Sequence, residues 1–384
     1  MPTPLTMAPN VRAEDGLWVQ DAEAPPLAAL RPLTPAAKGV FPVYHDLTER
    51  LIHPADPIQP GVTHPDRVVA RTLATCAGYA YSDAGTVATM MARLGLEGNR
   101  CRMIGTYVDA MFIASTAFLV QSASGRVVIL AYRGTQPTGL ISWLADADLA
   151  RSKIALTVGG EPCDVHGGFY RNTRATRYKI TEALLRAKQG LPITAPKGTT
   201  HPGPKTPALQ PMEALYITGH SLGGAIAAIH TILLMTDDNQ HAALGDVHKA
   251  TYTFGQPMVG SPELAQGCDA IAALRDNVVR FVYRKDPVPH VPPRDAGSFA
   301  HFGREYAFDR GAWTPRLRKS EQMHGVVGLL SSGLSFLTGR ISALHALSMG
   351  YQIDDHAPQH YIEALTPEGG LTEFGDHPYR NTPA

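Results

Sequence analysis

The spacing of hydrophobic residues predicts helices at the start of the main domain and again later in the chain. From Asp66 to Leu94, apolar residues recur at intervals of three and four positions, which is the period of amphipathic helices. We therefore expect two helices there, joined near Asp83 to Gly85. Further helices are expected from Phe169 to about Lys188 and from Leu222 to about Met235.

Short apolar runs bounded by glycine, proline and polar residues predict strands between these helices. The run from Arg126 to Tyr132 is apolar on both faces, as expected of a central strand. The other predicted strands are Ala114 to Gln121, Ala214 to Thr218, Ala250 to Phe254 and Asn277 to Tyr283. Strands that alternate with helices favour the α/β class, with a mostly parallel sheet covered by helices on both faces.

Prolines set the first part of the chain apart from the rest. Ten of them fall between Met1 and Gln59. Proline fixes φ and lacks a backbone donor, so long helices and central strands are not expected there. We expect a Pro-rich N-terminal extension over residues 1–60 and one α/β domain over residues 61–384, with insertions at 191–211 and 294–350.

Composition changes this picture mainly by exclusion. The 384 residues include 34 basic and 34 acidic ones, so the formal net charge is zero. This balance leaves no field to attract nucleic acid, and no nucleic-acid partner is expected. The four cysteines lie far apart without a CxxC pair, which argues against a zinc or thioredoxin-like motif and leaves both free thiols and two disulfides open.

The chain shows no membrane or export signal of the usual kind. Its N-terminus has no basic segment followed by an apolar run, so we expect a cytoplasmic protein or one exported by a non-standard route. An apolar helical pattern from Val326 to Met349 is interrupted by Arg340 and His345. It is too short and mixed for a transmembrane segment, and we expect it to pack on the core, cover the site or adsorb to an interface.

A serine between a predicted strand and a predicted helix is the strongest candidate for chemistry. Gly219-His220-Ser221-Leu222-Gly223 is a G-x-S-x-G motif. A serine at such a sharp turn projects Oγ above the sheet, and the flanking glycines are small because strand and helix nearly touch. We predict Ser221 as a nucleophile and the Leu222 N–H as an oxyanion donor. The alternative is a Gly-rich turn with an exposed serine.

A serine nucleophile needs a base and a carboxylate that orients the base, and in this type of fold both follow the serine along the chain. Asp286 comes just after the strand predicted to end at Tyr283. Sites on open α/β sheets collect at the carboxyl ends of strands. Asp286 is therefore the candidate acid, and a turn-forming role in its Pro-rich loop is the alternative.

These residues resemble the class 3 (fungal-type) lipases of the α/β-hydrolase fold. The segments similar to landmarks of that family are, in order, Tyr132-Arg133-Gly134-Thr135, Ser142-Trp143-Leu144-Ala145-Asp146, His166-Gly167-Gly168-Phe169, Gly219 to Gly224, Phe254-Gly255-Gln256-Pro257 and Asp286 to Pro293. The resemblance covers roughly Arg126 to Pro293 and the C-terminal histidine region. It implies an α/β-hydrolase fold with a mostly parallel central sheet, helices on both faces and a helical lid or cover.

The resemblance also implies two further parts of a site. Thr135 would be the second oxyanion donor, through its N–H and its hydroxyl. The apolar cluster just after it would form a lid or substrate-binding segment, and its members are Leu140, Ile141, Trp143 and Leu144. The same cluster would suit an ordinary surface helix packed on the core.

The histidine that would act as base has two candidates. The family places it a few residues before a tyrosine that opens a final helix, and His356 precedes Tyr361 at that spacing. His360 is the alternative base. A pair of surface histidines or a metal pair is also open, although no H-E-x-x-H motif or third ligand is evident. His220 is not expected to be the base, and His166 is expected to pack or to hydrogen-bond a loop near the site.

The predicted function is that of a serine carboxylic-ester hydrolase, most simply a triacylglycerol lipase or esterase that cleaves neutral lipid esters through an acyl-enzyme. No metal or organic cofactor is implied. The expected partner is a lipid or small ester substrate, with action at an oil–water or membrane interface left open. The alternatives are a phospholipase A1 or acyltransferase of the same fold, and a non-catalytic lipase-like lipid-binding or signalling protein.

Overall fold

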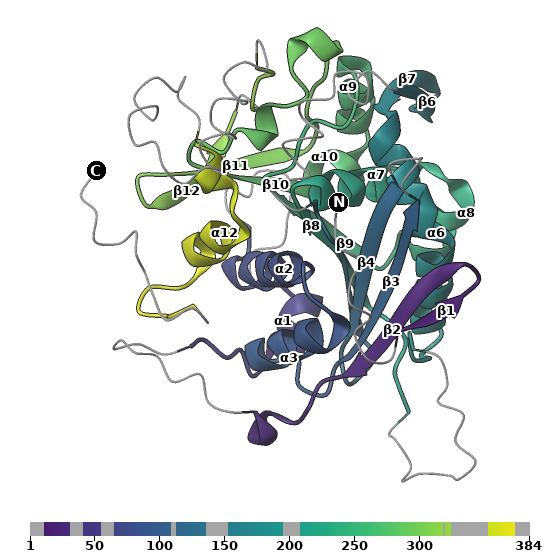
Figure 1. Ribbon diagram of the computed structural model, residues 1–384, viewed down its shortest axis with the longest axis vertical. Helices are drawn as coiled ribbons and strands as arrows, with labels where there is room; N and C mark the ends of the chain where they lie inside the picture. Colours follow the sequence, from purple (N-terminus) through teal and green to yellow (C-terminus); the bar gives the residue numbers. More distant parts are fainter. Residues whose placement is uncertain are drawn as a thin grey trace.

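A ten-stranded sheet forms the centre of the protein (Figure 1). The computed structural model describes residues 11–30, 41–54, 65–108, 113–135, 153–194, 208–317, 319–323 and 352–372. The strands of this sheet, in spatial order, are β1 (Arg12–Glu14), β2 (Leu17–Glu23), β3 (Arg100–Val108), β4 (Ile113–Gln121), β5 (Val127–Tyr132), β8 (Ala214–His220), β9 (His248–Phe254), β10 (Val278–Tyr283), β11 (Arg304–Asp309) and β12 (Ala312–Arg316). A separate hairpin pairs β6 (Lys153–Val158) with β7 (Glu161–His166).

The five central strands, from β5 through β8, β9 and β10 to β11, run parallel to one another. Antiparallel strands extend the sheet on both sides, with β1 to β4 beside β5 and β12 beside β11. The mostly parallel sheet expected from the sequence is confirmed at its centre, where the buried strands are apolar on both faces.

Helices cover both faces of the sheet. The described helices are α1 (Leu47–Ile52), α2 (Arg67–Tyr79), α3 (Ala84–Leu94), α6 (Gly167–Lys188), α7 (Leu222–Thr236), α8 (Asp238–Leu244), α9 (Pro262–Ala270), α10 (Ala272–Asn277) and α12 (Pro358–Leu365). In β5, Val127, Ile129 and Ala131 pack toward α1, α2, α3 and α12. The alternating residues of the same strand pack toward α6, α7 and α8. This two-sided burial explains why β5 carries no polar position.

Local capping fixes the two helices that open the main domain. The Asp66 carboxylate accepts hydrogen bonds from the N–H groups of Val68 and Val69 at the start of α2. Asp83 accepts from the N–H of Thr86 and caps α3 in the same way. The predicted junction near Asp83 to Gly85 is therefore confirmed, because the capping aspartate marks where the second helix begins.

Part of the expected N-terminal extension lies in the sheet. Strands β1 and β2 form a hairpin, and β2 pairs antiparallel with β3. The stretch between Pro9 and Pro25 holds no proline, so its backbone N–H groups remain available for strand pairing. Strands β11 and β12 likewise come from the expected insertion at 294–350.

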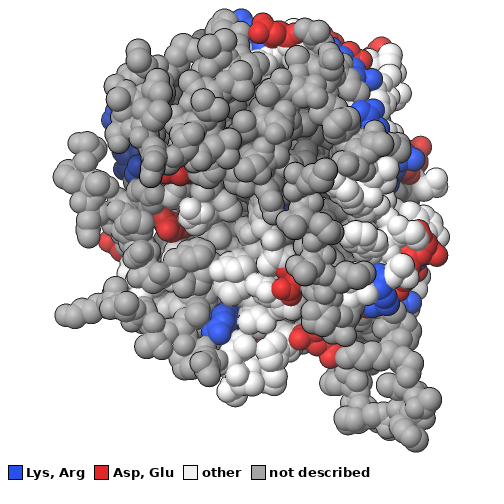
Figure 2. Space-filling view, in the orientation of Figure 1, with Lys and Arg blue, Asp and Glu red and all other residues white. Residues whose placement is uncertain are grey.

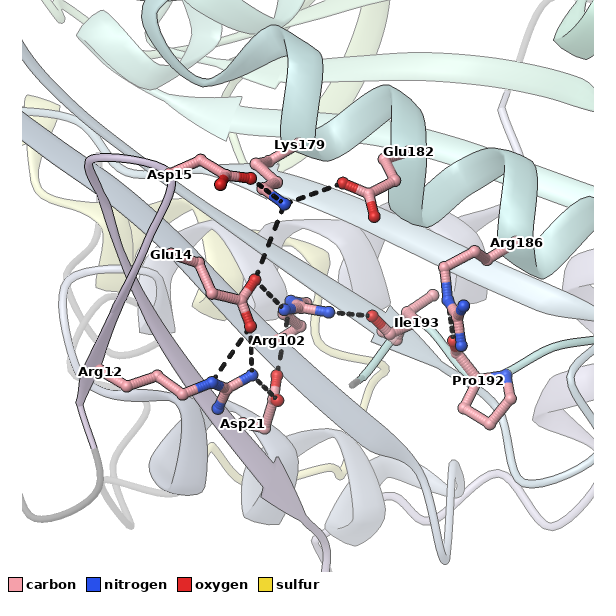
Figure 3. Close-up of polar contacts among 10 residues, drawn as sticks. All are labelled: Arg12, Glu14, Asp15, Asp21, Arg102, Lys179, Glu182, Arg186, Pro192 and Ile193. Atoms are coloured by element: carbon pink, nitrogen blue, oxygen red, sulfur yellow. Dashed lines mark hydrogen bonds and ion pairs between the residues drawn. The ribbon is translucent and has the colours of Figure 1, made fainter. Parts of the chain in front are cut away.

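An ion-pair network fastens the hairpin to the rest of the domain (Figure 3). Arg102 on β3 binds Glu14 at 2.8 Å, lies 3.6 Å from Asp21 and donates to the carbonyl of Ile193 at 2.7 Å. Lys179 on α6 contacts Asp15 at 2.6 Å. These contacts tie β1 and β2 to both the sheet and a covering helix.

The surface charges, the cysteines and the character of the helices add three observations. On the face drawn in Figure 2, the visible acidic and basic side chains lie in small intermixed groups. All four cysteines lie in the described part of the chain and are buried free thiols. Among the helices that the structure describes, none combines the length and the apolar character that crossing a membrane requires.

Candidate active site

Four neighbouring parallel strands end at one place, and each delivers a segment of the candidate site. Strand β5 leads to Thr135, β8 to Ser221, β9 to Gly255 and β10 to Asp286. The carboxyl ends of parallel strands meet at a single edge of the sheet, which is where sites on open α/β sheets form. A cavity of about 510 Å³ lies at the opposite, amino ends of β8 and β9, and none of the candidate catalytic residues lines it.

Ser221 sits at a strained turn between β8 and α7. Its backbone has φ 59° and ψ −130°, a conformation that non-glycine residues rarely adopt and that costs on the order of 1 kcal/mol or more. Its N–H donates to the carbonyl of Phe254 at 2.9 Å, which ties the turn to the neighbouring strand. This is the strained backbone that the sequence motif predicted for a nucleophile.

The two glycines of the motif allow close contact between strand and helix. A Cβ at Gly219 would lie 2.2 Å from the carbonyl oxygen of Gly223, and a Cβ at Gly223 would lie 2.2 Å from the carbonyl oxygen of Tyr132. No side chain fits in either place. The expectation that strand and helix nearly touch at this turn is confirmed.

Asp286 and His356 form a buried acid–base pair. His356 Nδ1 lies 2.8 Å from Asp286 Oδ2 and 3.0 Å from Oδ1. Asp286 also accepts a hydrogen bond from the N–H of Val288 at 2.8 Å and a short one from the hydroxyl of Tyr361. The carboxylate is fully buried, so these three donors replace the water that would otherwise solvate it.

The geometry after β9 requires a glycine at position 255. Its φ is +57°, and a Cβ there would lie 2.7 Å from Asp286 Oδ2 and 2.8 Å from His356 Nδ1. Any larger residue would therefore press on both partners of the acid–base hydrogen bond. This contact gives a physical reason for the Phe254-Gly255-Gln256-Pro257 segment, which the sequence identified only by resemblance.

The backbone before His356 is fastened to the backbone before Asp286. The N–H of Gln352 donates to the carbonyl of Lys285 at 3.0 Å, and the N–H of Lys285 donates to Asp355 Oδ2 at 3.1 Å. Burial raises the pKa of Asp355, and the hydrogen bond from Lys285 partly offsets that effect. These two links hold the base segment beside the acid loop.

Two atoms that a serine–histidine proton transfer would use are buried without partners. Ser221 Oγ and His356 Nε2 make no hydrogen bond to any described residue. Nδ1 of His356 faces Asp286, so Nε2 is the nitrogen left for a substrate or nucleophile. The structure thus leaves both reacting atoms available.

The second histidine candidate lies elsewhere. His360 stacks on Tyr283 with ring centroids 5.4 Å apart, and its Nδ1 is 3.7 Å from Glu363 Oε2. Of the two histidines weighed as the base, His356 is the one that hydrogen-bonds Asp286.

Two other histidines have the structural contacts expected of them. His166 caps α6 by accepting from the N–H of Phe169 at 3.3 Å and stacks on that ring, and burial lowers its pKa to about 4. His220 contacts Tyr81 and the backbone of His356, and burial lowers its pKa well below the usual value. Sequence reasoning placed Tyr81 only in the apolar pattern of a predicted helix and used Tyr361 only as a spacing marker.

The remaining predicted site residues divide into two groups. Thr135 follows β5 at the edge of the described segment, and Leu222 is the first residue of α7 behind Ser221. The lid residues lie outside the described residues, as does the apolar pattern from 326 to 349. They are Leu140, Ile141, Trp143 and Leu144, and their role stays a prediction. Within the described ranges, no group of three or more His, Cys, Asp or Glu side chains is placed to hold a metal ion.

Comparison with known proteins agrees with this geometry. Residues 129–296 match the family model of class 3 lipases. Over these residues, which are fewer than half of the chain, the protein is similar to class 3 lipases. The matched segment contains Ser221 and Asp286, and His356 lies beyond it.

The curated relatives of this protein are distant. A triacylglycerol lipase from Ricinus communis is 27% identical over 225 residues, which cover 51% of this chain and 41% of the relative. A phospholipase A1-II from Oryza sativa subsp. indica is 26% identical over 241 residues, which cover 55% of this chain and 52% of the relative. The chain spans about half the length of the curated relatives it matches.

A solved structure supports the fold. Lipase II from Rhizopus niveus superposes with a TM-score of 0.50 at 18% sequence identity, covering 76% of this chain and 92% of that one. The α/β-hydrolase fold expected from the resemblance is therefore confirmed.

Proposed function

We propose that this protein is a serine carboxylic-ester hydrolase that cleaves neutral lipid esters, with triacylglycerol lipase or esterase activity. The observation that carries the proposal is the buried hydrogen bond between His356 and Asp286, formed beside a strained Ser221 turn. The match of residues 129–296 to the class 3 lipase family model supports the same chemistry. The distant relatives that bear lipase names support it at the level of the family.

The proposed mechanism follows from the direction of the hydrogen bonds. Asp286 accepts a hydrogen bond from the N–H at His356 Nδ1, so Nε2 carries the lone pair that removes the proton from Ser221 Oγ. Oγ then attacks the ester carbonyl, and Asp286 stabilises the imidazolium that forms. His356 returns the proton to the departing alcohol, leaving an acyl group on Ser221. Water, deprotonated by the same ring, releases the acid.

Negative charge on the carbonyl oxygen needs donors that are already in place. Leu222 supplies one candidate N–H because it is the first residue of α7, behind the nucleophile. We assign the second donor to Thr135, at the end of the segment that leaves β5. The close approach of Gly223 to the carbonyl of Tyr132 brings these two segments together.

A chain-length series of p-nitrophenyl esters, dissolved and emulsified, tests the proposal. Ser221→Ala should reduce hydrolysis to background, because removing the nucleophile typically costs on the order of 10⁶ in kcat. Ser124→Ala, in the turn between β4 and β5, is the control and should retain wild-type activity. Substantial turnover by Ser221→Ala would overturn the proposal.

Phospholipase A1 activity is the second candidate, because the rice relative that bears this name matches as well as the lipase does. Both activities would use the same three side chains and would differ in the head group accepted. Assays with emulsified triacylglycerol and with phosphatidylcholine vesicles separate them, with Ser221→Ala as the blank in each. Release of fatty acid from the vesicles alone would favour the phospholipase.

A further inference from the structure

A buried chain of hydrogen bonds reaches the candidate base from a distant part of the sequence. The hydroxyl of Tyr81, just after α2, lies 2.9 Å from His220 Nδ1. His220 Nε2 lies 2.7 Å from the carbonyl oxygen of His356. The chain thus links the α2–α3 connection, the nucleophile turn and the base.

The chemistry of the three groups fixes the direction of both bonds. A carbonyl oxygen can only accept, so Nε2 of His220 carries the proton. Nδ1 then presents its lone pair, and the hydroxyl of Tyr81 donates to it. Burial lowers the pKa of His220 well below its usual value, which keeps the ring neutral and this tautomer intact.

His220 also contacts the ring of His356. The two ring centroids are 4.5 Å apart with the planes inclined by 33°. His220 is 3% exposed, and it directly precedes Ser221 in the chain. The His220 side chain therefore contacts both the backbone and the ring of His356, from a position next to Ser221.

Tyr81 also packs against the segment that leads from β5 to Thr135, the proposed oxyanion donor. A Cβ at Gly134 would lie 2.1 Å from the Tyr81 hydroxyl and 2.6 Å from the carbonyl oxygen of His220. Gly134 directly precedes Thr135. Tyr81 and His220 thus pack against the Ser221 turn, the His356 segment and the segment that leads to Thr135.

The base segment is short, and its links to the acid loop do not contact the carbonyl of His356. His356 ends a single 3₁₀ turn over Ile353–His356, and Pro358 opens the next helix without a backbone N–H to offer. A displacement of about 1 Å in a reacting group can cost a factor of about 10² in rate. The carbonyl of His356 is therefore a point at which a fixed donor can set where Nε2 lies.

We propose that Tyr81 and His220 are positioning residues, which hold the backbone and ring of His356 so that its Nε2 faces Ser221. This inference rests on the proposed function, because it assigns His356 the role of base. Neither residue exchanges a proton with the substrate. Each acts only through His356.

Tyr81→Phe is the sharpest variant because it removes one oxygen atom and keeps the ring. The lost donor frees His220 to adopt the other tautomer, which has no proton for the carbonyl of His356. We expect kcat to fall about 3- to 10-fold, with KM and the thermal midpoint unchanged, as for the loss of one hydrogen bond. Tyr178→Phe is the matched control, since Tyr178 is 75% exposed on α6, and it should behave as wild type.

His220 is tested by two substitutions. His220→Leu removes both hydrogen bonds and should lower kcat about 10²-fold. His220→Gln keeps an N–H donor and an oxygen acceptor, so it should recover part of that loss. Equal activity of the Leu and Gln variants would contradict the proposal, because bulk alone would then account for the role of His220. If the Leu variant does not fold, Tyr81→Phe still decides the question.

The NMR signal of the His356 Nδ1 proton provides a readout that does not depend on activity. This proton is hydrogen-bonded to Asp286, and we expect its resonance and the titration of His356 to change in Tyr81→Phe and not in Tyr178→Phe. Unchanged resonance, titration and kcat in Tyr81→Phe would overturn the inference while the proposed function stands. If wild type and Ser221→Ala hydrolyse esters equally, the proposed function fails, and the resonance alone decides whether Tyr81 positions His356.

Discussion

Gly255 shapes the site because it has no Cβ. Its backbone brings β9 against the acid–base pair, where a Cβ would press on Asp286 and His356. Gly159 has a similar positive φ of 64° but has nothing within 4 Å of a Cβ. Both positions have a positive φ, but only at Gly255 would an added Cβ contact other residues.

We expect Gly255→Ala to lower kcat for a soluble ester by about 10²-fold, because it displaces reacting groups. Gly159→Ala should keep full activity and lose only the stability that the strain costs, about 1 kcal/mol. Steady-state kinetics and denaturant unfolding of both variants check this prediction. A Gly255→Ala enzyme with wild-type kcat would show that the pair tolerates displacement.

At the scale of single residues, the sequence predicted the groups that local motifs mark. Ser221 was predicted because its motif is contiguous, and Asp286 because it follows a recognisable strand. The roles of Tyr81 and Gly255 could not be predicted from local sequence, although a family landmark marked the Gly255 segment, because each role depends on contacts with segments that are distant in the sequence. No short motif records such a contact.

Among the elements, the N-terminal hairpin depends on the ion pairs of Arg102 (Figure 3). The Arg102 side chain is 9% exposed and contacts Glu14, Asp21 and a backbone carbonyl. Arg12 binds the same two carboxylates but is 39% exposed. Burial makes charged hydrogen bonds harder to replace with water, so the two arginines should differ in importance.

Arg102→Met should lower the free energy of unfolding by about 2 kcal/mol, because the Ile193 carbonyl loses this donor and Glu14 and Asp21 keep only their pairs with more exposed groups such as Arg12. Arg12→Met should cost less than about 1 kcal/mol, as expected for exposed pairs. Urea unfolding of both variants gives the comparison. Equal losses would mean that burial does not govern the strength of this network.

A buried ion pair joins β10 to β11 and predicts a dependence on pH. Burial tends to raise the pKa of Glu305, but Arg280 at 2.9 Å, His301 and Ser320 lower it to about 2. A carboxylate whose pKa falls on folding stabilises the fold above its unfolded pKa of about 4.5 and loses that contribution as the pH falls toward 2.

The free energy of unfolding of the wild type should therefore fall between pH 4.5 and 2 more steeply than that of Glu305→Gln. The variant should be less stable at pH 7, because it leaves Arg280 buried without its charge partner. Unfolding curves at a series of pH values measure both slopes. Parallel slopes would show that Glu305 has no depressed pKa in the folded protein.

The sequence predicted the elements whose apolar residues recur with a clear period and missed the elements that lack such a period. The central strands and the helices α2, α3, α6 and α7 have apolar patterns that their burial imposes. Strands β7 and β12 contain Pro162 and Pro315, and both lie where a missing backbone donor is tolerated. Edge and hairpin strands are partly exposed, so nothing in their composition separates them from loops.

At the scale of the whole molecule, the topology gathers the site from separate segments. The parallel order of β5, β8, β9 and β10 brings four strand ends together, and the 3₁₀ turn Ile353–His356 and α12 bring His356 and Tyr361 back to them. The zero net charge fits the proposed neutral ester substrate, which would be held by apolar contact and not by charge. The sequence could indicate the layers of the fold but not the closeness of these segments.

Labelling with a fluorophosphonate tests the central claim, which is that Ser221 is a nucleophile activated by His356 and Asp286. The account predicts one added phosphonyl group per chain, located by mass spectrometry on the peptide that contains Ser221. Labelling should be absent in Ser221→Ala and much slower in Asp286→Asn, which disturbs the tautomer of His356. An unlabelled wild type, or equal labelling of Ser221→Ala, would contradict the account.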